Sequence, residues 1–383
     1  MGFISQFGQL LFLALIFFLN FTGRITCSPL MSQIEAELGL SHAQAGSFFL
    51  IISVGYFLSM LGSGLISSKI THRSTIVLSA VSVGLALIGV SLSQGLWTIR
   101  MSFLLTGLAA GIYLPSGIAT LTSLVDQQHW GKAVAVHELA PNASFVLAPL
   151  LAEALSVWFS WRGVLACIGL GSIGVGTAFA VFGKGGRFYG RSPGISAARP
   201  ILTKPAFWVM AVLFGLAIAS TLGIYTMLPL FLTTERGMTR TWANSIVGLS
   251  RISGIFMAMI AGLISDRFGP KRSIFMVLFL TGVMSVLLGV VSGPWTSIFV
   301  FLQPVMAVCF FPPGFSALSS IGPPSARNVA VSFAVPLGFV VGGGLIPLMI
   351  GTAGDLGSFG AGIAITGGLI FAGAFLTFLL KIE

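Results

Sequence analysis

Hydrophobic residues form long continuous runs along this chain of 383 residues, and short polar stretches separate the runs. Apolar and polar positions do not alternate strictly, so the pattern is that of helices. Each run is long enough to cross an apolar core of about 30 Å. The pattern predicts twelve membrane-spanning helices, roughly at 8–31, 42–66, 74–92, 96–122, 133–157, 163–183, 206–232, 241–265, 273–291, 295–320, 328–351 and 357–380.

Composition agrees with this pattern, because 56% of the residues are hydrophobic and only 7% are charged, with a mean hydropathy of +1.02. A soluble domain carries about a quarter charged residues, so a soluble protein is excluded. A transmembrane β-barrel is excluded as well, since its strands would alternate. The first run lacks a basic start and a cleavage site, which predicts a retained first helix.

The chain is expected to consist of two repeated halves. Glu37-Leu-Gly-Leu-Ser41 corresponds to Glu235-Arg-Gly-Met-Thr239, and Gly64–Ser67 corresponds to Gly262–Ser265, in both cases 198 positions apart (37 to 235, 64 to 262). Ser41 and Thr239 are also expected to cap the helices that follow them. The Gly-, Pro- and Arg-rich stretch between the sixth and seventh runs reads as a linker. The predicted organisation is an N-terminal six-helix bundle at 1–183, a cytoplasmic linker at 184–205 and a C-terminal six-helix bundle at 206–383. Two pseudo-symmetric bundles of this kind are expected to rock about a central site.

Lysine and arginine are concentrated in alternate loops. With a cytoplasmic N-terminus, the cytoplasmic side holds Lys69, Arg73, Lys132, Lys184, Arg187, Arg191, Arg199, Lys204, Arg267, Lys271, Arg272, Arg327 and Lys381. The opposite side holds Arg100, Arg162, Arg236 and Arg240. This bias predicts cytoplasmic termini in a bacterial-type inner membrane. It also accounts for the net charge of +10, so nucleic acid is not an expected partner.

Two arginines, Arg24 and Arg251, lie inside predicted spans, one in each half. A cation at the centre of a membrane helix costs at least roughly 2.5–3.5 kcal/mol, so it is expected to face a water-filled cavity or a partner. A guanidinium binds a carboxylate or phosphate through two parallel hydrogen bonds and keeps its charge. The pair therefore predicts a central site for a negatively charged solute.

Other polar residues in the spans extend this hypothesis. Asn20 and Ser28 lie one turn to either side of Arg24 and form a polar stripe with it. The alternative for Arg24 is snorkelling towards the outer interface, and for Arg251 it is an ion pair within one bundle, for example with Glu138. Further candidates for contact with the solute are Tyr56, Tyr113, Tyr225 and Gln303, for which packing is the alternative.

His137 and Glu138 begin the fifth predicted helix, and their repeat positions are Ser332 and Phe333. A buried carboxylate can titrate near neutral pH, and an adjacent histidine can relay protons. Together with Asn142 one turn beyond, they are candidates for proton coupling. The alternative is contact with the cytoplasmic gate or with lipid headgroups.

Other kinds of chemistry find no support in the sequence. There is no phosphate-binding loop for ATP and no cluster with the spacing of metal ligands. Cys27, Cys167 and Cys309 lie in apolar runs and suggest no disulfide framework. We therefore expect no enzyme activity, no metal and no cofactor. The expected partners are a small anion, protons and the lipid bilayer, with the protein as a monomer.

The segment Gly262–Arg272 reads GLISDRFGPKR. It resembles the loop signature of the major facilitator superfamily, as do the twelve spans, the linker and Trp161-Arg162. The resemblance implies transport by alternating access, with a gate motif made of Gly262, Asp266, Arg267, Gly269, Lys271 and Arg272. In the family the aspartate braces the cytoplasmic gate by pairing with basic residues and a helix end. The first-half copy, GLISSKITHR at Gly64–Arg73, has Ser68 in place of that aspartate and Thr71 in place of the glycine.

Weaker similarities concern the solute. Asn20-Phe-Thr-Gly-Arg24, followed by Ser28-Pro29, is similar to the first-helix region of the organic-anion branch. Arg251 resembles the substrate-binding arginine of monocarboxylate and oxalate carriers. Ala148-Pro149-Leu-Leu-Ala152 is only a degraded form of the antiporter motif, so that motif does not support antiport.

The sequence thus predicts a secondary active transporter for a small carboxylate-like anion, coupled to protons as a symporter. One alternative is an exporter of amphipathic, drug-like or lipid-like molecules on the same fold, which the 33 phenylalanines and 13 methionines would suit. The other is a membrane sensor that does not transport.

Overall fold

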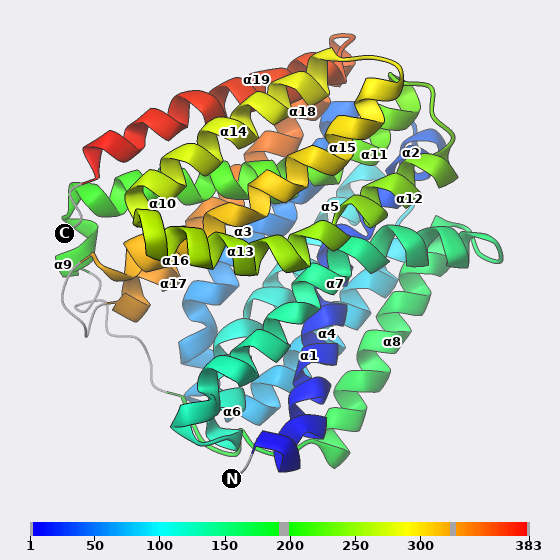
Figure 1. Cartoon of the computed structure of the whole chain (residues 1–383). Coiled ribbons are helices and arrows are strands. Elements are labelled where there is room, and N and C mark those ends of the chain that lie inside the picture. The colour runs from blue at the N-terminus through cyan, green and yellow to red at the C-terminus, as the bar shows by residue number, and fades with distance from the viewer. Residues whose placement is uncertain (1–2, 191–198, 322–326, 381–383) are drawn as a thin grey trace. The chain divides into compact units, whose positions relative to one another are not determined.

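The computed structural model describes residues 3–190, 199–321 and 327–380, and every regular element in those residues is helical (Figure 1). The centre of the predicted linker and the basic residues Arg191 and Lys381 lie outside the described residues. Among the described residues, eleven helical stretches are long and apolar enough to cross a membrane. The fold is therefore the expected all-α membrane fold.

One predicted span differs from its prediction. The run 241–265 is not a continuous helix but two pieces, α12 (Arg240–Ser250) and α13 (Ile252–Phe268), with a turn at Arg251. Neither piece alone reaches the length of the other spans. The sequence gives no proline at this position. The hydroxyls of Ser250 and Ser253 donate to the backbone carbonyls of Val247 and Ser250 beside this turn, as serine hydroxyls also do inside the unbroken helix α3 (His42–Ser67).

By compactness the chain divides into two units. The first contains Met1–Ile34 and Val54–Pro193, and the second contains Glu35–Ser53 and Gly194–Glu383. The helices before residue 193 are α1 (Phe3–Ile25), α2 (Cys27–Leu38), α3 (His42–Ser67), α4 (His72–Leu92), α5 (Leu96–Gly111), α6 (Tyr113–Leu124), α7 (Trp130–Ser156) and α8 (Trp161–Phe182), of which α2 and α3 are divided between the two units.

The helices after residue 194 all belong to the second unit. They are α9 (Arg199–Leu202), α10 (Pro205–Ile218), α11 (Ile224–Thr234), α12, α13, α14 (Pro270–Val290), α15 (Pro294–Ala307), α16 (Phe311–Ser319), α17 (Arg327–Val340), α18 (Ile346–Asp355) and α19 (Phe359–Ala374).

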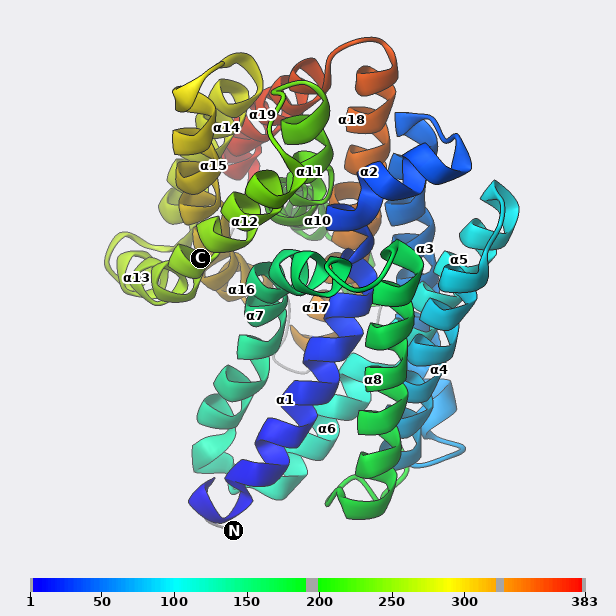
Figure 2. The ribbon, with the colours of Figure 1, turned by 90° about the vertical axis from the view of Figure 1, so that its right-hand side faces the viewer.

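Equivalent glycines bring together equivalent helices in the two units. In the first unit α4 packs along α8, and a Cβ on Gly84 would lie 2.4 Å from the carbonyl oxygen of Gly169 (Figure 2). In the second unit α14 packs along α19, and a Cβ on Gly367 would lie 2.9 Å from the carbonyl oxygen of Gly282 (Figure 1). Each glycine of the second pair follows its counterpart by 198 positions (84 to 282, 169 to 367). The sequence repeat is therefore also a repeat of helix packing.

Both predicted helix caps are present. The Ser41 hydroxyl accepts from the backbone N–H of Gln44, whose side-chain oxygen accepts in return from the N–H of Ser41, a reciprocal capping box. The Thr239 hydroxyl accepts from the N–H of Trp242 at the start of α12. Asp355, which the sequence did not single out, adds a carboxylate that accepts from the N–H groups of His42 and Ala43. The beginning of α3 is thereby fixed to the end of α18 within the second unit.

Candidate functional site

Arg24 lies in the last turn of α1, where the first membrane-spanning stretch is interrupted. α1 ends at Ile25 and α2 begins at Cys27. Pro29 explains the interruption, because it has no N–H for the carbonyl oxygen of Ile25 and its ring clashes with that carbonyl. The C-terminal end of a helix carries partial negative charge, so it is a favourable position for a guanidinium.

Aromatic rings surround the guanidinium of Arg24. Its central carbon lies 3.9 Å from the ring centroid of Tyr56 in α3 and 5.2 Å from that of Phe21, and the residue is only 4% exposed. A desolvated contact between a cation and an aromatic face contributes up to about 2 kcal/mol. The first unit therefore holds a permanent positive charge in a mostly apolar interior, where electrostatic interactions are strongest.

The two polar neighbours predicted for Arg24 are both buried. The Asn20 side-chain nitrogen donates to the Ser79 hydroxyl at 3.2 Å and to the carbonyl of Ala110 at 3.3 Å. It thus links α1 to α4 and α5 instead of serving only the arginine. Ser28 lies in the first turn of α2 and is 1% exposed. Because the helix is interrupted between Arg24 and Ser28, Asn20 and Arg24 belong to α1 and Ser28 to α2, so the three do not share one face of a continuous helix as the polar stripe was predicted to do.

Arg251 occupies the turn between α12 and α13, so it lies at the C-terminal end of one helix and at the N-terminal end of the next. Its Nη1 donates to the backbone carbonyl of Thr221 at 3.0 Å, and its central carbon lies 4.8 Å from the ring centroid of Tyr225 in α11. The residue is 8% exposed. Each unit thus contains a buried arginine at the interruption of a membrane helix, placed over the ring of a tyrosine.

The carbonyl that Arg251 contacts belongs to a π-helical turn, Ala219–Gly223, between α10 and α11. Gln303 of α15 binds the same turn, because its side-chain nitrogen donates to the carbonyl of Ser220 at 2.9 Å and to the Ser285 hydroxyl at 3.3 Å. Arg251 and Gln303 therefore hold consecutive carbonyls. The role observed for Gln303 is to fix this turn, and π-turns inside membrane helices frequently mark functional positions.

A second π-helical turn, Val341–Leu345, lies between α17 and α18 and packs on the first. A Cβ on Gly342 would come within 2.3 Å of the carbonyl oxygen of Gly215, and one on Gly223 within 2.3 Å of that of Gly342. Neither π-helical turn was predicted from the hydrophobic pattern. The triple glycine 342–344 is the one local signal that could have indicated such a close approach of two backbones.

Tyr113 and His137 form a buried stack with Phe17. The three rings are close to parallel, with centroids 4.4 Å apart for Phe17 and His137 and 5.3 Å apart for Phe17 and Tyr113. Tyr113 and His137 are both 0% exposed. The Tyr113 hydroxyl donates to the carbonyl of Leu13 at 2.8 Å and lies 3.0 Å from Nε2 of His137. Tyr113 thus belongs to the histidine cluster in the core of the first unit.

These contacts select the tautomer of His137. A tyrosine hydroxyl has one hydrogen, and Tyr113 uses it for Leu13, so Nε2 of His137 must carry the hydrogen between the two side chains. The neutral ring then has its lone pair on Nδ1. That atom is buried without a hydrogen-bond partner among the described residues, and it lies 3.5 Å from Oε1 of Glu138. The Glu138 side chain is 51% exposed, and Asn142 donates to its backbone carbonyl at 2.9 Å.

The gate motif lies at the junction of α13 and α14. Asp266 is exposed and makes no hydrogen bond or ion pair with another described residue. Arg267 lies over the ring of Phe268 at 5.6 Å. Lys271 donates to the carbonyls of Leu380 and Phe378 at 2.8 and 3.3 Å. The pairing of Asp266 with these cations, which the resemblance implied, is therefore not seen in the part of the chain that the structure describes.

Gly269 and its repeat counterpart Thr71 both have left-handed backbone conformations. Gly269 has φ 81° and ψ 154°, a region that is essentially restricted to glycine. Thr71, 198 positions earlier, has φ 53° and ψ 155°, although it carries a Cβ. Its hydroxyl accepts from the N–H of Ser74 at 3.3 Å. The first half thus retains the loop shape of the motif with a residue that strains it.

We expect Thr71→Gly to stabilise the protein by about 1 kcal/mol, because strain of this kind costs about 1–3 kcal/mol and replacing a threonine cap with glycine costs only a few tenths. Gly269→Ala should have the opposite effect. Thermal unfolding of both variants in detergent measures the difference. A Thr71→Gly protein that unfolds at a lower temperature than the wild type contradicts the assignment of strain.

Comparisons with known proteins agree with this architecture. A family model described as Major Facilitator Superfamily matches residues 13–347. The membrane sensor protein UhpC of Salmonella typhimurium is 22% identical over 307 residues, which are 74% of this chain and 68% of the relative. A probable 4-methylmuconolactone transporter of Cupriavidus pinatubonensis is 21% identical over 363 residues, 87% of this chain and 82% of the relative.

Among solved structures, a bacterial homologue of the human lysosomal transporter Spinster, described as inward-facing and occupied, superposes with a TM-score of 0.86. It is 15% identical, and the match covers 100% of this chain and 97% of the other. This similarity shows the fold. With the family model matching most of the sequence, the chain belongs to the major facilitator superfamily, whose members are transporters.

Proposed function

We propose that this transporter moves a small organic anion across the inner membrane by symport with protons, as a monomer with both termini in the cytoplasm. Residues 1–183 and 206–383 would be its two bundles, and 184–205 the cytoplasmic linker. The observation that supports an anionic substrate is an arrangement found in both units: the guanidinium of Arg24 lies over the ring of Tyr56, and that of Arg251 lies over the ring of Tyr225. Arg24, Arg251 and their two tyrosines are the proposed determinants of substrate charge.

Each of the two arginines lies over an aromatic face, a contact that contributes up to about 2 kcal/mol. An arginine held in this way is oriented in advance for a carboxylate or phosphate, which it can bind through two parallel hydrogen bonds.

Proton coupling rests on the geometry of His137. Its Nδ1 carries the lone pair and faces the carboxylate of Glu138, which is half exposed. A proton from solvent can bind to Glu138 and then pass to Nδ1. The resulting imidazolium would lie against the face of Phe17, an arrangement that favours a cation. In this proposal Glu138 is the relay, His137 is the acceptor and Tyr113 fixes the tautomer.

We expect His137→Gln to abolish accumulation of the anion driven by a pH gradient while exchange of labelled for unlabelled anion continues. For one coupled proton, a gradient of one pH unit is worth about 1.4 kcal/mol, or about tenfold accumulation. Purified protein in liposomes with an acidic outside provides the measurement, with Lys132→Gln, at an exposed position of the same helix α7, as the control. Tenfold accumulation by His137→Gln would exclude His137 as the coupling residue.

A second candidate function is sensing without net transport, which the name of the UhpC relative favours. Counterflow in liposomes separates the two possibilities. A panel of monocarboxylates, dicarboxylates and phosphate esters is first screened for ligands that raise the unfolding temperature, since a ligand at 100 times its Kd adds about 2.7 kcal/mol. A transporter shows counterflow of the stabilising anion. A sensor binds the anion and shows none.

A further inference from the structure

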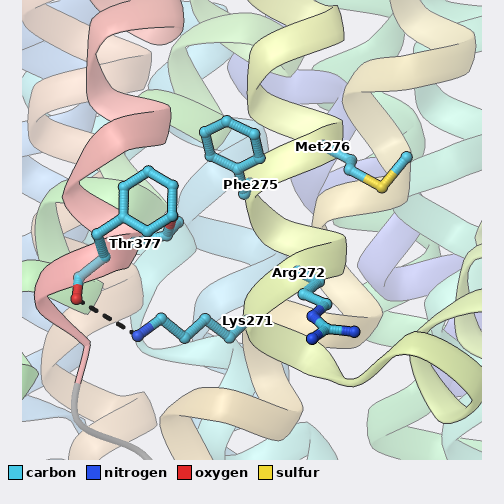
Figure 3. A pocket seen from close by; sticks show the side chains of 6 residues that line it. Lys271, Arg272, Phe275, Met276 and Thr377 are labelled. Atoms are coloured by element: carbon cyan, nitrogen blue, oxygen red, sulfur yellow. Dashed lines mark hydrogen bonds between the residues drawn. The ribbon is translucent and has the colours of Figure 1, made fainter.

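A groove of about 330 Å³ lies between the beginning of α14 and the segment Phe375–Leu379 that follows α19 (Figure 3). Its lining combines two cations with a surface that is otherwise mostly apolar. The residues that line it are Lys271, Arg272, Phe275, Met276, Thr377 and Phe378. The proposed transport mechanism uses none of this apolar surface.

The cations lie at one end of the groove and differ in what they already bind. Lys271 donates to two backbone carbonyls at the end of the segment that follows α19, so two of its three N–H donors are engaged. Arg272 is exposed and makes no hydrogen bond or ion pair with any described residue. Both belong to the first turn of α14, where the helix end adds partial positive charge. This end of the groove is therefore suited to a phosphate.

The apolar part of the groove is one turn further into the membrane span. Phe275 packs against Phe378 with ring centroids 5.2 Å apart and against Phe375 at 5.6 Å. Phe378 remains 63% exposed and Met276 54% exposed. A soluble phosphate or a small acid would leave this surface uncovered. A ligand with a charged head and a long apolar chain would cover both parts.

The groove also lies at the depth where such a ligand occurs. The span that contains the groove begins at Pro270, so Lys271 and Arg272 stand at its polar end and Phe275 and Met276 stand inside it. We propose that this groove binds one anionic phospholipid, with its phosphate on Arg272 and Lys271 and an acyl chain along Phe275, Met276 and Phe378. This inference does not depend on the identity of the transported solute.

Native mass spectrometry of the full chain in detergent tests the proposal, with phosphatidylglycerol and phosphatidylcholine as probes. The wild type should bind the first phosphatidylglycerol molecule more tightly than phosphatidylcholine. Each basic residue near an anionic headgroup contributes about 1 kcal/mol, so Arg272→Gln should weaken phosphatidylglycerol binding about fivefold. Arg267→Gln is the matched control, because Arg267 belongs to the same motif but does not line the groove, and it should change binding less than twofold.

Further arms test the acyl chain and the source of the phosphate. Met276→Ser changes an exposed side chain and should weaken both lipids without removing the preference for the anionic one. Inorganic phosphate at millimolar concentration should not displace phosphatidylglycerol. Equal affinity for the two lipids, equal effects of Arg272→Gln and Arg267→Gln, or full displacement by phosphate would each overturn the assignment.

Discussion

Arg251→Gln is expected to weaken binding of the transported anion by about 100-fold or more, since hydrogen bonds to charged groups are worth about 1.5–3 kcal/mol each and the fork provides two. The glutamine is two bonds shorter than the arginine and loses the bond to the carbonyl of Thr221, so the unfolding temperature of the variant is measured beside its affinity to separate a loss of charge from a loss of folding. The measurement is the Kd for the anion that most stabilises the wild type in the thermal-shift panel.

Two further variants separate charge from geometry at Arg251. Arg251→Lys keeps the positive charge but loses the planar fork and its stacking on Tyr225, so its affinity should lie between those of the wild type and Arg251→Gln. Lys204→Gln removes an exposed positive charge from the same unit and should leave the affinity unchanged. If Lys204→Gln weakened binding as much as Arg251→Gln, the effect would come from overall charge and not from a site.

Arg24→Gln is expected to produce a loss of similar size in the first unit, and Tyr56 provides the sharper test. Tyr56→Phe keeps the aromatic face under the guanidinium and loses only the hydroxyl's hydrogen bond with Arg24, worth about 1 kcal/mol, so it should bind the anion about fivefold more weakly than the wild type. Tyr56→Leu removes a contact worth up to about 2 kcal/mol and should bind about tenfold or more weakly. Uptake kinetics in liposomes report both effects as changes in KM. Equal KM values for the two tyrosine variants would show that the aromatic face does not hold Arg24.

The all-α membrane fold could be predicted from the sequence because the insertion of a helix into the bilayer depends on its hydropathy and on the charge of the adjoining loops, and both follow directly from composition. The two glycine pairs at 84 and 169 and at 282 and 367 show that the repeat seen in the sequence is also one of packing. The break after Arg24 could have been anticipated from Pro29. The break at Arg251 could not be anticipated, because no proline marks it. Hydrogen bonds from serine hydroxyls to backbone carbonyls are too weak a signal to predict a turn by themselves.

The sequence was less informative about what each polar side chain binds. Tyr113, Gln303 and Asn20 were all reasonable candidates for contact with a solute, because hydroxyls and amides suit anions. Their partners instead come from distant parts of the chain: Leu13 and His137 for Tyr113, and carbonyls of neighbouring helices for the two amides. Contacts of this kind depend on helix packing, which leaves no local pattern. The tautomer of His137 follows only from these contacts.

The role of Arg251 in recognising the charge of the solute is tested by comparing an acid with its uncharged ester. Binding of the preferred carboxylate and of its methyl ester is measured with wild-type protein and with Arg251→Gln under the same conditions. We expect the wild type to prefer the carboxylate by about 100-fold or more. Arg251→Gln should lose most of this preference by binding the acid more weakly and the ester about as before. A wild type that binds acid and ester equally, or a variant that keeps the full preference, would contradict the assignment of Arg251 to anion recognition.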